Sequence, residues 1–252
     1  MDAAKPQPKT PRPKPNLGRP LPVILRTILI FIVSQALGYL IVGLVYGLIH
    51  PSRNTAIGDS IPAQFFYVLI AEGVSAVFAV YLVRIRNLDL GVIGLGRRPA
   101  FRDLIRGALG FAAFYVLLII AGVVINYFSP DLNKQQQNLG FNNINTSADN
   151  LLAFISLVII PPLGEETLVR GYLFSGLRGF WRFWPAMLAT SLIFGAAHLE
   201  FGSGGPLVWA AALDTFLLSV VLCFLRERTG ALYAGMLVHM LNNLIAFGVH
   251  FK

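Results

Sequence analysis

Seven apolar segments, most of them long enough to cross a lipid bilayer, constrain this chain more than any other feature. A helix needs about 20 residues to span the hydrocarbon core, and only helices or closed barrels satisfy their backbone in lipid. The runs lack the polar alternation of barrel strands. We therefore expect an all-α, polytopic transmembrane bundle of about seven spans, or eight if one segment is split. The segments are residues 21–49, 64–83, 104–128, 151–174, 185–199, 207–225 and 231–249.

Composition places the chain in the same class. Hydrophobic residues make up 56% of the sequence and charged residues 13%, whereas about a quarter of a soluble domain is charged. The single cysteine, Cys223, excludes an internal disulfide and any site built from several cysteines.

The basic residues that give the net charge of +8 lie mostly in the loops of this bundle, so they do not indicate a nucleic-acid-binding surface. Of the 20 Lys and Arg residues, 16 fall in the N-terminal region and alternate loops, and three fall in the other loops. Positive residues favour the cytoplasmic side, so we expect a cytoplasmic N-terminus in the cell membrane. Residues 1–20, rich in proline and basic side chains, should be a disordered cytoplasmic tail, and residues 21–252 the transmembrane domain.

Charged side chains are concentrated in the fourth apolar segment. Glu165, Glu166 and Arg170 lie within six positions of one another. Charges at membrane depth are costly and usually mark a functional site. Glu166 and Arg170 are four residues apart in the favourable order, which predicts a structural ion pair. Pro161 and Pro162 should kink or restart the helix, placing the carboxylates near a new helix N-terminus.

Three further polar residues lie on other apolar segments, and each needs a buried partner. They are His198 at the end of the fifth segment, and His239 and Asn243, which share one helical face in the seventh. The least costly solution is for them to meet the carboxylates. Two other acids, Glu72 and Asp214, are expected to be buried hydrogen-bonding residues or to line the same cavity.

In this pattern the sequence resembles the CPBP intramembrane proteases, which include the CAAX proteases, the bacteriocin-processing enzymes and the Abi family. The resemblance covers residues 151–247, about 40% of the chain. It is carried by Glu165-Glu166-Thr167-Leu168-Val169-Arg170, by Phe194 followed four residues later by His198, and by His239 followed four residues later by Asn243. The resemblance implies proteolysis of a membrane-associated protein or peptide substrate.

The residue types suit that chemistry without a metal. Glu165 is the expected general base for a water, and His198 is expected to hold this water and pass a proton to the leaving amine. His239 and Asn243 are expected to donate hydrogen bonds to the oxyanion. We expect the last four helices to enclose this site in a cavity reached from the cytoplasmic side.

A zinc site is the alternative chemical interpretation of the same residues. Glu165, His198 and His239 would supply two histidines and a glutamate, a ligand set that leaves a position for water. The metal-free glutamate mechanism is favoured, because a metal would leave the base and oxyanion roles to Glu166 and Asn243, and Glu166 is already committed to Arg170.

Two other functions use the same residues. A proton-coupled transporter also carries Glu, His and Asp across a bundle, although the sequence shows no inverted repeat. A catalytically idle immunity or binding protein on this scaffold is the other alternative. The sequence leaves the identity of the substrate, including any prenyl group, open.

Overall fold

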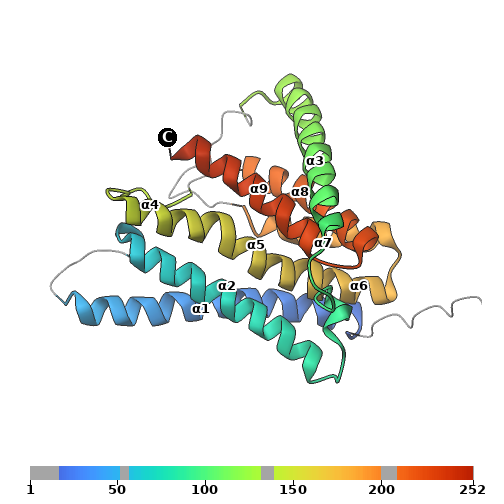
Figure 1. Ribbon diagram of the computed structural model, residues 1–252, viewed down its shortest axis with the longest axis horizontal. Helices are drawn as coiled ribbons and strands as arrows, with labels where there is room; N and C mark the ends of the chain where they lie inside the picture. Colours follow the sequence, from blue (N-terminus) through green and yellow to red (C-terminus); the bar gives the residue numbers. More distant parts are fainter. Residues whose placement is uncertain (1–16, 52–56, 132–138, 200–208, 252) are drawn as a thin grey trace, which may run out of the picture.

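The computed structural model describes residues 17–51, 57–131, 139–199 and 209–251, and this part of the chain is helical without a β-strand (Figure 1). The prediction of an all-α bundle is confirmed. Most of the tail predicted to be disordered, residues 1–16, lies outside the described residues.

Each of the seven apolar segments corresponds to a helix. Four stretches are long and apolar enough to cross a membrane: α1, α2, α3 and the continuous run from Ser147 to Phe180. Helix α7 is shorter, and α9 carries the polar residues of the candidate site. The helices are α1 (Pro20–Ile49), α2 (Ile61–Arg84), α3 (Phe101–Phe128), α4 (Ser147–Phe154), η4 (Ile155–Ile159), α5 (Ile160–Glu165), η5 (Glu166–Phe174), α6 (Ser175–Phe180), α7 (Phe183–Ala196), α8 (Ala210–Thr229) and α9 (Tyr233–His250), with short turns η1 (Ile57–Asp59) and η2 (Leu90–Ile93).

The run from Ser147 to Phe180 passes through the middle of the bundle (Figure 1). Helices α1 and α2 pack together on one side of it, and α7, α8 and α9 lie on the other. Helix α3 packs against α8 and α9 at its beginning and then extends away from them.

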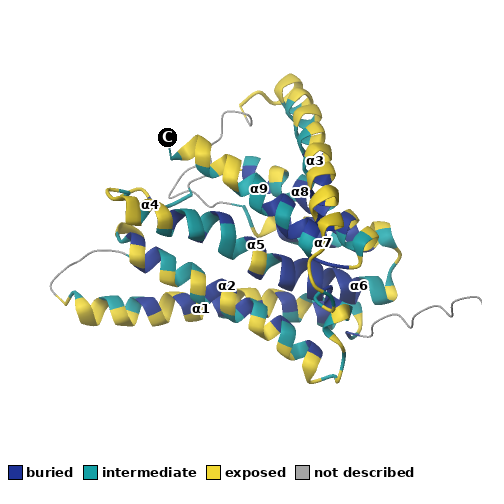
Figure 2. Cartoon of the chain, in the orientation of Figure 1, coloured by how far each residue is buried: buried dark blue, intermediate teal, exposed yellow. Residues whose placement is uncertain are grey.

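Burial separates a polar centre from an apolar exterior. Buried residues are concentrated in η5 and the neighbouring parts of α8 and α9, whereas α1 and α3 are largely exposed (Figure 2). The exposed side chains on these outer helices are apolar, as at Leu44, Leu48 and Val123, which are 68%, 81% and 68% exposed. Such a surface is unfavourable in water and suited to lipid, so the chain is an integral membrane protein.

The basic loops meet at one end of the bundle. Arg226 donates a hydrogen bond to the carbonyl of Val92, 2.8 Å away, and the guanidinium of Arg97 lies 5.4 Å from the ring centre of Tyr233. This end is closed by tight packing. A Cβ atom at Gly107 would come within 2.7 Å of Leu237, so α3 touches α9 there.

Candidate active site

At the two prolines the central helix changes form, and a new α-helical stretch, α5, begins at Ile160 with proline in its first turn. In η4 the helix widens to a π-helical turn, and the N–H of Ile160 donates to the carbonyl of Ile155. A wider turn accommodates proline rings that would clash with the preceding carbonyls of an α-helix. The N–H of Glu166 donates to the carbonyl of Pro162. Glu166 therefore does not lie at a new N-terminus with a free amide of its own.

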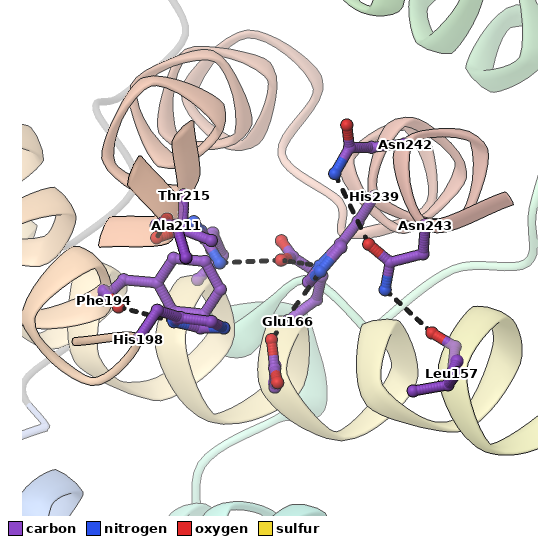
Figure 3. Close-up of polar contacts among 11 residues, drawn as sticks. Leu157, Glu166, Phe194, His198, Ala211, Thr215, His239, Asn242 and Asn243 are labelled. Atoms are coloured by element: carbon purple, nitrogen blue, oxygen red, sulfur yellow. Dashed lines mark hydrogen bonds and ion pairs between the residues drawn. The ribbon is translucent and has the colours of Figure 1, made fainter. Parts of the chain in front are cut away.

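Proline at both positions leaves one backbone carbonyl without a helical donor. The carbonyl of Leu157 would accept from residue 161 in an α-helix or from residue 162 in a π-helix, and neither proline has an N–H. The side-chain amide of Asn243 fills this place, with Nδ2 2.9 Å from the Leu157 oxygen (Figure 3). Asn243 thus links α9 to the widened turn of the central helix. The spacing of Leu157 from the two prolines would have indicated that the Leu157 carbonyl needs such a donor.

This link can be tested by a double-mutant cycle. Asn243→Ala should lower the free energy of unfolding in detergent by about 1–3 kcal/mol, because a buried acceptor loses its donor. Pro161→Ala restores a backbone N–H, so the loss caused by Asn243→Ala should be smaller in that background. Asn242→Ala is the control, since the side chain of Asn242 makes one hydrogen bond within the described residues, a 3.5 Å bond to the neighbouring Asn243 side chain. Additive effects of the two changes would show that the prolines and Asn243 are not linked.

Glu166 lies at the centre of a buried polar cluster. Arg170 Nη1 donates to Glu166 Oε1 over 2.7 Å, and the two side chains are 1% and 0% exposed. The same oxygen lies 3.1 Å from His239 Nδ1. Glu166 therefore holds both the arginine on its own helix and the histidine on α9, a second contact that the sequence did not indicate.

His239 lies between the two adjacent carboxylates (Figure 3). Its Nδ1 faces Glu166, and its Nε2 lies 3.7 Å from Glu165 Oε2. With His239 protonated, the two glutamates are balanced by Arg170 and the imidazolium. The nitrogen facing Glu165 is then a proton donor directed toward the predicted base.

Phe194 connects His198 to this cluster. Its ring centre lies 4.2 Å from the guanidinium carbon of Arg170, 4.6 Å from the ring of His198 and 6.0 Å from the ring of His239. The carbonyl of Phe194 is 2.9 Å from His198 Nδ1. Because a carbonyl only accepts, Nδ1 carries the proton and Nε2 remains an acceptor. The spacing of Phe194 and His198 is part of the family resemblance, but the contact of Phe194 with Arg170 was not predicted.

Two glycines allow other helices to approach the carboxylates. A Cβ atom at Gly235 of α9 would lie 3.3 Å from Glu166 Oε2, and one at Gly164 would clash with the carboxylate of Glu72 on α2. Glu72 is 8% exposed and packs behind the residue that precedes Glu165. It is a buried residue outside the cavity lining, which was one of the two roles expected for it.

A cavity of about 800 Å³ lies in front of these groups. It brings together all four predicted catalytic residues and Asp214. The lining comprises Phe114, Tyr115, Leu118, Leu139, Leu157, Pro161, Glu165, His198, Ala211, Asp214, Thr215, Leu218, His239, Asn242, Asn243, Ile245, Ala246, Phe247, Val249 and His250.

The described cavity lining lies away from the contacts at the basic end of the bundle. It comes from the first half of α8, residues 239–250 of α9, the middle of α3, the central helix, His198 and Leu139. At the basic end, α3 packs closely on α9 through Gly107 and on α8 through Gly110. Access to the cavity from the cytoplasmic side stays a prediction.

The proposed zinc ligands, Glu165, His198 and His239, all line the cavity. Within the described ranges, no three His, Cys, Asp or Glu side chains lie close enough together to hold a metal ion in this arrangement. The Nδ1 atoms of His198 and His239 face the Phe194 carbonyl and the Glu166 carboxylate, as the second ring nitrogen of a metal-binding histidine commonly does. The zinc alternative is therefore tested by chelation.

The structure thus places an acid–histidine cluster beside a cavity in a membrane-embedded helical bundle. Residues 147–245, less than half of the chain, match the family described as type II CAAX prenyl endopeptidase Rce1-like. This match supports the resemblance to the CPBP family of CAAX proteases that the motifs of the region predicted. The chain is also 36% identical over 94 residues to an uncharacterised 24.3 kDa protein of Escherichia coli, covering 36% of this chain and 41% of that protein. No solved structure matches the chain significantly.

Proposed function

We propose that this protein is an intramembrane endopeptidase that cleaves membrane-associated protein or peptide substrates with a water activated by Glu165. The observation that supports this most strongly is the position of His239, which lies between Glu165 and Glu166 at the wall of a large cavity. The family match of the same region supports a protease.

In the proposed reaction, Glu165 takes a proton from water as the water oxygen bonds to the substrate carbonyl carbon. His239 Nε2–H donates to the oxyanion that forms, while Glu166 holds the ring through Nδ1. His198 Nε2 accepts a hydrogen bond from the same water. As the carbon–nitrogen bond breaks, the proton held by Glu165 passes to the leaving amine, directly or through His198, which yields a carboxylic acid and an amine.

Asn243 has a narrower role in this scheme than the sequence indicated. One N–H of its amide is directed at Leu157. A contribution of the other N–H to the oxyanion remains a prediction. We also retain as a proposal the orientation with the N-terminus in the cytoplasm, which the contacts among the basic loops at one end of the bundle support.

A substrate trap tests the proposed function. Membranes containing Glu165→Ala should retain intact proteins that wild-type membranes contain as fragments, and affinity capture followed by mass spectrometry would identify them. Purified wild-type protein should cleave these proteins and keep its activity after exhaustive chelation. Identical captured proteins and fragments in both samples would contradict proteolysis, as expected of the transporter or idle alternatives. Activity lost on chelation and restored by zinc would replace the glutamate mechanism with a metal-dependent one.

A further inference from the structure

The described cavity lining contains acids but neither Lys nor Arg, although the sequence has 20 Lys and Arg residues against 12 Asp and Glu. Its titratable groups are the carboxylates of Glu165 and Asp214, the phenol of Tyr115 and three histidines, His198, His239 and His250. His239 lies beside Glu165, 3.7 Å away, and can balance that carboxylate. The remaining carboxylate, Asp214, favours a positively charged group on the occupant.

Asp214 is the carboxylate that the proposed reaction does not use. It lies on the fifth residue of α8, beyond the N–H groups that a capping side chain satisfies, and its side chain is exposed. Among the described residues no Lys, Arg or His forms an ion pair with it. A carboxylate of the cavity lining without such a partner is available to a ligand.

An aromatic side chain of the neighbouring helix lines the cavity together with Asp214. Tyr115 of α3 belongs to the same lining, and α3 packs against α8. The ring of Tyr115 contacts Phe111 and Phe114 on its own helix, with ring centres 4.7 and 5.3 Å apart. A carboxylate and an aromatic ring in one cavity can together bind an ammonium or guanidinium group through charge-assisted hydrogen bonds and cation–π attraction.

We propose that Asp214 and Tyr115 form a subsite for a Lys or Arg side chain of the peptide substrate. This inference rests on the proposed function in one respect, that an apolar peptide occupies the cavity. Because Asp214 and Glu165 line one cavity, the basic residue and the cleaved bond belong to the same peptide segment. The rest of the lining is mostly apolar, so the subsite fixes the register in which that segment binds.

Peptide binding measures the subsite without cleavage. The probes are fluorescein-labelled Leu/Ala peptides of about 20 residues, the length of one membrane span, with a single Lys moved along the sequence and a matched set carrying Gln. They are titrated into purified Glu165→Gln protein in detergent. At one register the Lys peptide should bind about tenfold tighter than its Gln partner. Adding Asp214→Asn should remove this ratio, and Asp214→Lys should make the Gln peptide bind tighter than the Lys peptide at the same register.

Asp131→Asn is the matched control, because it removes an exposed acid that does not line the cavity and should preserve the Lys preference. A Lys-to-Gln ratio near one at every register, or a ratio that survives Asp214→Asn, would overturn the subsite. The same peptides are then incubated with protein that retains Glu165. Lys preference without cleavage of any peptide would count against the proposed protease activity alone, whereas cleavage without Lys preference would count against the subsite alone.

Discussion

Glu166→Ala should lower the free energy of unfolding in detergent by about 3–5 kcal/mol, the cost of leaving one member of a buried ion pair unpaired. Arg170 is fully buried, and the described structure gives its Nε and Nη2 atoms no hydrogen-bond acceptor. Glu166 is therefore its one carboxylate partner among the described residues. Arg170→Ala should cost a similar amount, because it removes the same pairing and the contact with the Phe194 ring.

Removing both charges separates pairing from catalysis. The double change Glu166→Gln with Arg170→Met should recover most of the lost stability, since no charge is left unpaired. It should also recover part of the activity, because the Gln carbonyl can still accept from His239 Nδ1. Thermal unfolding and cleavage rates are measured for the same preparations. A Glu166→Ala protein as stable as wild type but inactive would show that this carboxylate serves the reaction rather than the fold.

Glu165→Gln should have the opposite effect, with normal stability and a loss of turnover by about two orders of magnitude or more. The change conserves size, and Glu165 makes no ion pair shorter than the 3.7 Å contact with His239. His239→Ala should reduce turnover similarly, by removing the proposed oxyanion donor, while Arg170 continues to neutralise Glu166. The rates are measured on proteins whose unfolding temperatures agree with wild type. Retained turnover in either variant would remove that residue from the proposed mechanism.

The sequence predicted the helices well because each is long and apolar, and the lipid environment leaves few alternatives to a helix. It also placed Glu165, His198, His239 and Asn243 in one site, since each buried polar group needs a partner. These arguments use the need of each buried polar side chain for a hydrogen-bond or charge partner. They do not identify which neighbouring residue is that partner.

The remaining features depend on geometry between helices. Three features follow from how α5, α7 and α9 pack, which local spacing does not specify. They are the wide turn at η4, the contact of Glu166 with His239 and the position of the Phe194 ring beside Arg170. The extent of the cavity also depends on packing between helices. Its lining lies beyond the close contacts of α3 at Gly107 and Gly110, which the distribution of basic residues among the loops does not indicate.

The bond from Asn243 to Leu157 has a consequence for the order in which the protein assembles. The central helix leaves the ribosome well before α9, so during synthesis the Leu157 carbonyl and the Glu166 carboxylate both await partners that come from α9. Docking of α9 therefore supplies two partners at once, one to the backbone of the central helix and one to the side-chain cluster. A nascent chain that lacks α9 holds its glutamates without the histidine and asparagine that contact this helix.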